Sequence, residues 1–214
     1  MEMKIDELNS PEFNAAEFIK NYFKPMPITD EQKEEREETS YDMRNALLFL
    51  FALISVFGDY DAIDWIAVEE QFRLEFSNEA NKHAKSDKWL EDYIFIKVSD
   101  FIQITREQDL NDPYWLSDER ATMEAVNEAN DIVGHEELRK AIKAGYKYKT
   151  WRGIMDAKER ISHIKMEGKT VRITDYFYLD KGKMLYAHDW VNCPNECYNC
   201  RCATVYTKGG NNGH

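Results

Sequence analysis

The apolar positions in the first part of the chain recur at helical spacing and predict four helices. The first is expected to start at Ser10-Pro11, because proline suits the first turn of a helix, and to end before Pro25. The third and fourth are expected over about 61–84 and 88–107. Packing of their apolar stripes against one another would form a helical core.

The second predicted helix changes character along its length. Asp30 is expected to cap it, its first half is almost entirely charged, and residues 46–57 are apolar on all sides. Gly58-Asp59 is expected to break it. Such a helix passes from solvent into a core. The apolar run is also shorter than the roughly 20 residues that a helix needs to cross a bilayer, so no membrane span is predicted.

The pattern changes after Asn111-Asp112-Pro113, a turn that we interpret as a domain boundary. Ser117 is expected to cap a helix that Gly134 ends, and a shorter helix is expected over 135–144. Short strand candidates separated by glycine-containing turns then follow. They are residues 146–149, 170–177, 184–186 and 202–206.

These patterns predict an α+β protein with a helical N-terminal region and a small mixed module that ends in a cysteine-rich loop. The predicted boundaries are 1–110 for the acidic helical region, 114–206 for the α+β module and 207–214 for a flexible tail. The hydrophobic content of 43% is enough for a core and excludes disorder as the default state.

Charge divides the chain in the same way. The formal net charge of −12 combines −20 over residues 1–138 with +8 over residues 139–214. Between 139 and 183, 13 lysines and arginines face 5 acidic residues and alternate with aromatic residues. This mixture suits a nucleic-acid backbone, and it equally suits an acidic protein surface, including the N-terminal region of this chain. The predicted partner-binding residues are Arg139, Lys140, Lys143, Lys147, Lys149 and Arg152.

All four cysteines lie close together near the C-terminus: Cys193, Cys197, Cys200 and Cys202. The chain starts with mixed charges and no apolar signal segment, so we expect it in the cytosol at synthesis, where disulfides are disfavoured. Thiolates and imidazoles are zinc ligands, but only one pair here has the usual two-residue gap. The cysteines are therefore either zinc ligands, with His188 or His163 as a substitute, or buried or exposed thiols without a metal.

The densest polar stretch runs from Lys149 to His163. If it is helical from Gly153 onward, Asp156, Arg160 and His163 project from one face. In a structural role, the aspartate and the arginine would form an ion pair, and the histidine would donate a hydrogen bond to a neighbouring loop. As a catalytic unit, the histidine would be a base oriented by a carboxylate, with the arginine binding an anion. No nucleophile stands at a recognisable spacing, so the structural interpretation is favoured.

The order of motifs from Ser117 to Tyr206 resembles the conserved region of the Mu F-like phage head morphogenesis proteins, the minor head or minor capsid proteins of tailed phages. The final motif is Asn199-Cys200-Arg201-Cys202. Departures include Lys158 in place of an arginine and Ala187-His188 in place of an expected proline, while Cys193 and Cys197 are additions to the pattern. The other residues that carry the resemblance are Arg120, the stretch 125–128, Gly145, Lys149, Thr150, Trp151, Asp156, Arg160, His163, Gly168, Phe177 and Asp189.

The resemblance implies a virion protein that acts by binding at the portal or the inner head surface, during assembly or the packaging and release of double-stranded DNA. It implies no catalytic activity. The motif residues Trp151, Asp156, Arg160, His163, Gly168, Asn199 and Arg201 would then organise the module. Two alternatives stay open: a metal-dependent nuclease or nucleotide-transferring enzyme that uses His163 with Asp156 or Glu159 and Arg160, and a zinc-stabilised DNA-binding accessory protein.

Overall fold

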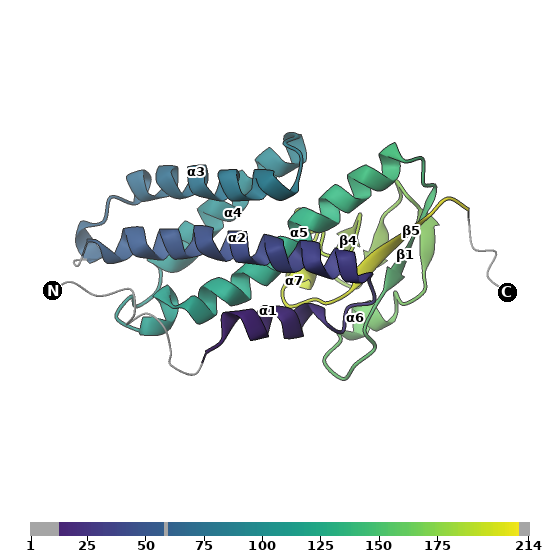
Figure 1. Ribbon diagram of the computed structural model, residues 1–214, viewed down its shortest axis with the longest axis horizontal. Coiled ribbons are helices and arrows are strands. Elements are labelled where there is room, and N and C mark those ends of the chain that lie inside the picture. Colours follow the sequence, from purple (N-terminus) through teal and green to yellow (C-terminus); the bar gives the residue numbers. More distant parts are fainter. Residues whose placement is uncertain (1–12, 58–59, 210–214) are drawn as a thin grey trace.

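The computed structural model describes residues 13–57 and 60–209 of the chain. Within these ranges, long helices form one end of the molecule and small β-sheets form the other (Figure 1). The α+β fold class is therefore confirmed. Three predictions lie outside the described residues: the helix start at Ser10-Pro11, the break at Gly58-Asp59 and the tail from residue 210 onward.

The four helices predicted for the first part of the chain are present. They are α1 (Ala15–Phe23), α2 (Asp30–Ser55), α3 (Trp65–His83) and α4 (Lys88–Arg106). The β-branched residues of α4 do not prevent its formation, because one side of the helix is buried in the core. A short 3-10 helix, Tyr60–Ala62, precedes α3.

Side-chain caps set the helix starts. The Thr29 hydroxyl accepts a hydrogen bond from the Gln32 backbone N–H, and the Gln32 side chain accepts one from the Thr29 backbone N–H. This reciprocal pair satisfies two backbone donors that would otherwise be free. The predicted cap at Asp30 is therefore wrong by one position, since Asp30 is the first helical residue. Asn14, Asp64 and Asp87 cap α1, α3 and α4 with single hydrogen bonds.

The core of the helical part is built on aromatic rings from α3 and α4. Phe72 and Phe76 meet edge to face with ring centroids 5.6 Å apart, and Phe101 lies 6.1 Å from each of them. The apolar half of α2 contributes fully buried residues, including Leu47 and Leu50. Helix α2 lies against both α3 and α5, which explains why its second half is apolar on several sides.

Helix α5 (Asp118–Lys143) is one continuous helix, so the predicted end at Gly134 and the separate helix over 135–144 are wrong. Ser117 caps it as predicted. A Cβ atom at Gly134 would lie 3.0 Å from the ring of Tyr186, so this glycine permits close packing in mid-helix. A 3-10 helix, Pro113–Leu116, occupies the predicted turn before α5.

The second part contains short elements, but the single strand predicted over 170–177 is wrong, because a turn at residues 173–176 divides it into two strands that belong to different sheets. The strands are β1 (Tyr148–Arg152), β2 (Thr170–Arg172), β3 (Phe177–Leu179), β4 (Gly182–Met184) and β5 (Ala203–Thr207), and the helices are α6 (Ile161–Ile164) and α7 (Pro194–Cys197). Thr207 therefore belongs to β5 and not to the predicted tail. All strand pairs are antiparallel, in a three-stranded sheet of order β2-β1-β5 and a two-stranded sheet β3-β4.

The register of the larger sheet divides its residues between two faces. Lys149 and Trp151 of β1 are fully buried and point to the inner face. Tyr148 is paired with Arg172 of β2 and with Thr207 of β5, so these three share the outer face. The inner face thus carries the module's core, and the outer face carries polar and aromatic groups.

Helix α5 contributes to the cores of both parts of the molecule. Ala121 and Ala125 pack in the helical core, whereas Leu138 and Ala141 pack with Ile173 of the module. The division into separate domains at residues 110–114 stays a prediction. No helix in the described parts of the chain is both long and apolar enough to span a bilayer.

Candidate functional site

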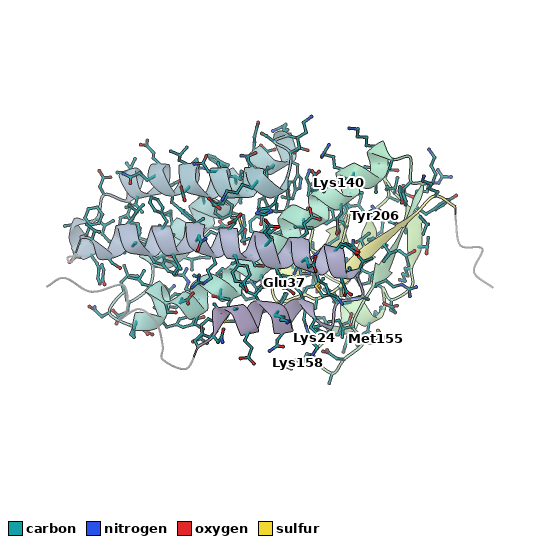
Figure 2. The ribbon with its side chains drawn as sticks, viewed as in Figure 1. Lys24, Glu37, Lys140, Met155, Lys158 and Tyr206 are labelled. Atoms are coloured by element: carbon teal, nitrogen blue, oxygen red, sulfur yellow. The ribbon has the colours of Figure 1, made fainter. Side chains whose placement is uncertain are left out.

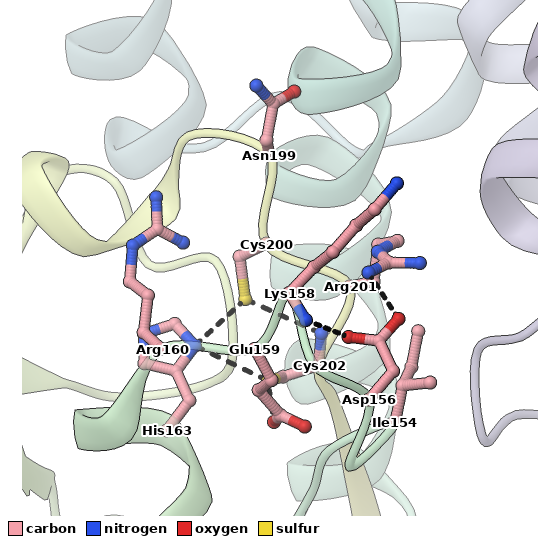
Figure 3. Close-up of a pocket in the computed structure, with 10 residues that line it drawn as sticks. All are labelled: Ile154, Asp156, Lys158, Glu159, Arg160, His163, Asn199, Cys200, Arg201 and Cys202. Atoms are coloured by element: carbon pink, nitrogen blue, oxygen red, sulfur yellow. Dashed lines mark hydrogen bonds and ion pairs between the residues drawn. The ribbon is translucent and has the colours of Figure 1, made fainter.

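The family-like motif residues from separate segments meet in one place beside β1 (Figure 3). The loop after β1 supplies Asp156 and Glu159, α6 supplies His163, and the loop before β5 supplies Cys200 and Cys202. They line a cavity with about 20 Å³ of space for the centre of a water molecule. This space is large enough for one water or one ion and too small for a nucleotide or another organic substrate.

One imidazole and two thiols form the centre of this site. Nδ1 of His163 lies 3.3 Å from Sγ of Cys200 and 3.4 Å from Sγ of Cys202. The Cys202 backbone N–H also donates to the Cys200 sulfur at 3.4 Å. All three side chains are at most 3% exposed. The arrangement places two soft ligands and one nitrogen ligand around a common point.

The other nitrogen of His163 faces a buried carboxylate. Nε2 lies 3.2 Å from Oε2 of Glu196, although the angle is not that of a hydrogen bond. Ser162 donates to the same oxygen at 3.0 Å. Trp151 meets the imidazole edge to face, with ring centroids 5.3 Å apart. The imidazole is thus held in orientation on both sides, with Nδ1 toward the sulfur atoms.

Burial and mutual contacts shift the protonation of the three groups. Burial opposes ionisation, but contacts with Cys202, His188 and His163 hold the pKa of Cys200 well below its usual range. The contact with Cys200, together with burial, raises the pKa of Cys202. Burial disfavours the imidazolium, yet the hydrogen bond with Cys200 raises the pKa of His163. The pKa values of the two thiols are therefore shifted in opposite directions.

The predicted helix from Gly153 through His163 is wrong in its first part. Residues 153–160 form a loop, and only Ile161–Ile164 is helical. Asp156 accepts a hydrogen bond from the Lys158 backbone N–H, a local turn that competes with helix formation, and Met155 has a φ of 61°. Asp156, Arg160 and His163 consequently do not share a helix face.

The predicted pairing of Asp156 with Arg160 is also wrong. Asp156 pairs with Arg201 at 2.7 Å, which joins the loop after β1 to the closing loop. Arg160 instead donates to the Tyr198 carbonyl at 2.6 Å. Both arginines therefore connect the same two loops by different routes. Figure 2 shows Met155 and Lys158 of this loop at the surface.

Gly168 and Asn199 hold left-handed backbone conformations, with φ angles of 73° and 53°. The Gly168 backbone N–H donates to the Trp151 carbonyl at 3.0 Å, which closes the turn that leads into β2. The Asn199 backbone N–H donates to the Asn127 side chain of α5 at 2.8 Å. These two residues therefore position the segments on either side of the site.

The four cysteines do not gather around one point. In the described ranges, the ligand atoms within 4.8 Å of one another are those of His163, Cys200 and Cys202. Cys193 packs against Gly182 of β4, where an added Cβ would lie 2.6 Å from its sulfur. The Cys197 sulfur donates to the Cys193 carbonyl at 3.3 Å. The structure thus brings His163 together with Cys200 and Cys202, as in the alternative in which a histidine is a substitute ligand. Cys193 and Cys197 lie in the core instead.

The predicted partner-binding residues have different environments. Arg139 pairs with Glu136, Lys140 with Glu35 at 3.3 Å, and Arg152 with Glu167 at 2.9 Å, while Lys143 and Lys147 are exposed.

The prediction for Lys149 is wrong. Its side chain is fully buried, and Nζ donates to the carbonyls of Ile173 and Leu185. Its position on the inner face of β1 places it in the core. Burial accordingly lowers the pKa of Lys149 to about 8.

Sequence reasoning missed Glu196 and Ser162, and it considered Glu159 only as a catalytic group. The sequence does contain an indication of Glu196, because it is the acidic residue within the cysteine-rich segment from Cys193 to Cys202. Its contact with His163 spans 33 positions of the sequence and depends on how α6 and α7 pack.

Comparison with known proteins gives one match. The family model described as Phage Mu protein F like protein matches residues 97–205, about half of the chain. The match covers α5, strands β1 to β4, the first three residues of β5 and the site. Neither the search of curated proteins nor the search of solved structures gives a match.

Proposed function

The chain belongs to the Phage Mu protein F-like family of phage head morphogenesis proteins, and from this premise we propose that it is a minor head protein that binds the portal or the inner face of the capsid shell. It would act during head assembly and the packaging or release of DNA. It would therefore be found in the head of the virion, and in the host cytoplasm during assembly.

The observation that supports this proposal most strongly is the burial of four of the family-motif residues. Trp151, His163, Cys200 and Cys202 are at most 3% exposed, and the cavity beside them holds about 20 Å³. A motif that is buried around so small a space suits an architectural role, in which the module keeps its shape and its surface makes the contacts.

The outer face of the three-stranded sheet is the surface that best fits such a contact. Tyr148 and Arg172 are neighbours on it. Lys147 alternates to the other face but is exposed at the adjoining end of the sheet, directly before β1. Within residues 13–57 and 60–209, Lys143, Lys147 and Arg172 are exposed and form no ion pair. Exposed basic residues beside an aromatic ring favour an acidic protein surface as partner. Contact with packaged DNA stays a prediction.

Co-expression with the portal and capsid proteins of the same phage tests the proposal. The wild-type chain is expected to copurify with the portal or with assembled heads. The double variant K147E/R172E is expected to be folded and to lose most of this association. The matched control is K20E/K24E, because Lys20 and Lys24 are exposed basic residues on α1, away from the sheet.

Two outcomes would contradict the proposal. In the first, wild-type protein is absent from heads and portals that otherwise assemble normally. In the second, K147E/R172E associates as well as the wild type, which would remove the sheet face from the interaction. Circular dichroism of each variant separates loss of binding from loss of folding.

A further inference from the structure

The spacing of three buried ligand atoms matches the dimensions of a zinc site. Nδ1 of His163 lies 3.3 Å from the Cys200 sulfur and 3.4 Å from the Cys202 sulfur. Tetrahedral zinc, with bonds of about 2.3 Å to sulfur and about 2.0 Å to nitrogen, separates these atoms by about 3.5 Å. The observed separations differ from that value by only a few tenths of an ångström, so an ion fits with small side-chain movements.

We infer that His163, Cys200 and Cys202 bind one zinc ion, and that the Glu159 carboxylate, which lies outside the group of ligand atoms within 4.8 Å of one another, moves closer to become the fourth ligand. Oε1 of Glu159 lies 3.2 Å from the Cys202 sulfur, and the carboxylate lines the same cavity. The Met155 backbone N–H donates to its other oxygen and keeps the carboxylate in place.

Gly153 leaves room for this fourth ligand. A Cβ atom at Gly153 would lie 2.0 Å from Oε1 of Glu159, so a larger residue would displace the carboxylate. The loop 153–160 therefore brings its glutamate toward the sulfur atoms by a close approach that only glycine allows.

The surroundings of His163 are those of a metal-binding imidazole. Zinc-bound histidines usually present the second ring nitrogen to a carboxylate or carbonyl, which fixes the orientation of the ring. Nε2 of His163 faces Glu196, whose carboxylate is 1% exposed and is also bonded by Ser162. Nδ1 is thereby directed to the sulfur atoms.

The chemistry and size of the site favour a structural zinc ion. Thiolate and imidazole ligands select zinc over the hard cations that prefer oxygen. A site with four protein ligands leaves no open position for a substrate, as is typical of structural zinc. The ion would join the loop after β1, helix α6 and the loop before β5, three segments with few backbone hydrogen bonds between them.

Metal analysis of the full-length protein tests the inference. After incubation with zinc and dialysis, the wild type is expected to retain one zinc per chain. C200S and C202S each replace a direct zinc ligand and are expected to lower the zinc affinity strongly. The loss should exceed the roughly 10–100-fold that follows when a residue hydrogen-bonded to a ligand is replaced. The matched controls C193S and C197S remove buried cysteines outside the site and are expected to keep the zinc.

A second measurement does not depend on the folding of any variant. Replacement of zinc by cobalt in the wild-type protein is expected to give the thiolate-to-cobalt charge-transfer absorption and the visible bands of a tetrahedral ion. A wild-type chain that retains neither metal would overturn the inference. Loss of zinc in C193S and C197S with full retention in C200S would overturn it as well.

The fourth ligand has its own test. E159Q is expected to weaken zinc binding, and G153A is expected to do the same by displacing the Glu159 carboxylate. His188 is the competing donor, because both of its ring nitrogens are buried and have no hydrogen-bond partner among the described residues. If H188Q weakens binding while E159Q and G153A do not, the assignment of Glu159 is wrong.

Discussion

Gly134 of α5 lies directly against Tyr186 of the α+β module, so closely that a Cβ atom on the glycine would be 3.0 Å from Cδ2 of the ring. The ring cannot easily withdraw, because Tyr186 is 1% exposed and also contacts Trp89 and His135. The contact joins the long helix to the module, and it explains why a glycine stands in the middle of a continuous helix.

The variant G134A is therefore expected to lower the free energy of unfolding by up to about 2 kcal/mol. Overpacking costs about 1–3 kcal/mol, and the gain in helix propensity offsets about 1 kcal/mol of it. Urea unfolding of the wild type and the variant measures the difference. In a Y186L background the same substitution should be neutral or stabilising, and a stabilised G134A in the wild-type background would contradict the explanation.

The ion pair between Arg36 and Glu137 holds α2 against α5. Two guanidinium nitrogens donate to the two carboxylate oxygens at 2.8 Å each, and Nε donates to Asn130 at 3.2 Å. R36M is expected to destabilise the protein by about 3–5 kcal/mol, because it leaves buried polar groups unpaired. The double variant R36M/E137L should recover most of this loss.

Chemical denaturation of the single and double variants checks this prediction. The control is the exposed pair Lys88 and Asp92, whose side chains are 86% and 52% exposed. K88M should change stability by less than about 0.5 kcal/mol. Equal losses in R36M and R36M/E137L would show that the arginine acts through packing and not through the pair.

Lys149 makes stability depend on pH in the alkaline range. Its pKa is lowered by burial to about 8, against 10.5 for a free lysine. Between these values the unfolded chain binds more protons at this residue than the folded chain, so the free energy of unfolding rises with pH. The rise is expected to be on the order of 1–3 kcal/mol from pH 8 to pH 10.

The variant K149M removes this titration and should lack that part of the slope. Denaturation of both proteins at pH 8, 9 and 10 measures how the free energy of unfolding changes with pH. The other titrating groups contribute equally in the two proteins, so the difference between them reports on Lys149. The same slope in the variant and the wild type would mean that Lys149 does not titrate in this range.

Glu196 is predicted to act on metal binding through His163. E196Q keeps the size of the side chain and removes the charge that faces Nε2. It should weaken zinc binding by about 10–100-fold, the usual effect of an outer carboxylate. Competition with a metal-binding dye measures the affinity. E69Q is a control, since Glu69 pairs with Arg73 on α3, outside the module that holds the site, and it should bind zinc as the wild type does.

The site is expected to catalyse no turnover of nucleic acid or nucleotides. The cavity of about 20 Å³ cannot hold a nucleotide, and His163 is 1% exposed. Incubation of the purified protein with DNA, RNA and a dinucleotide, with and without a chelator, checks this. Reproducible turnover that H163A abolishes would assign the site to an enzyme.

Local patterns were sufficient for most elements and insufficient where distant contacts decide. Periodicity predicted α1 to α4 and the order of the strands. The reason is that the apolar residues on the buried side of an element recur along the sequence at the spacing of that element. Periodicity failed at Gly134, whose role comes from Tyr186, and in the loop 153–160, where the local turn at Asp156 and pairing with Arg201 replace a helix. The prediction for Lys149 was wrong because only the register of β1 in the sheet places that side chain on the buried face.

The sequence by itself determined the α+β class, the separation of acidic and basic parts and the family to which the motif order pointed, since these depend on composition, spacing and order along the chain. The tertiary structure alone decided which residues meet: His163 with Cys200 and Cys202, Glu196 behind the imidazole, and Cys193 and Cys197 apart from them. The physical reason is that a ligand set depends on distances of a few ångströms between segments more than 30 residues apart, and the packing of α6, α7 and β5 sets those distances.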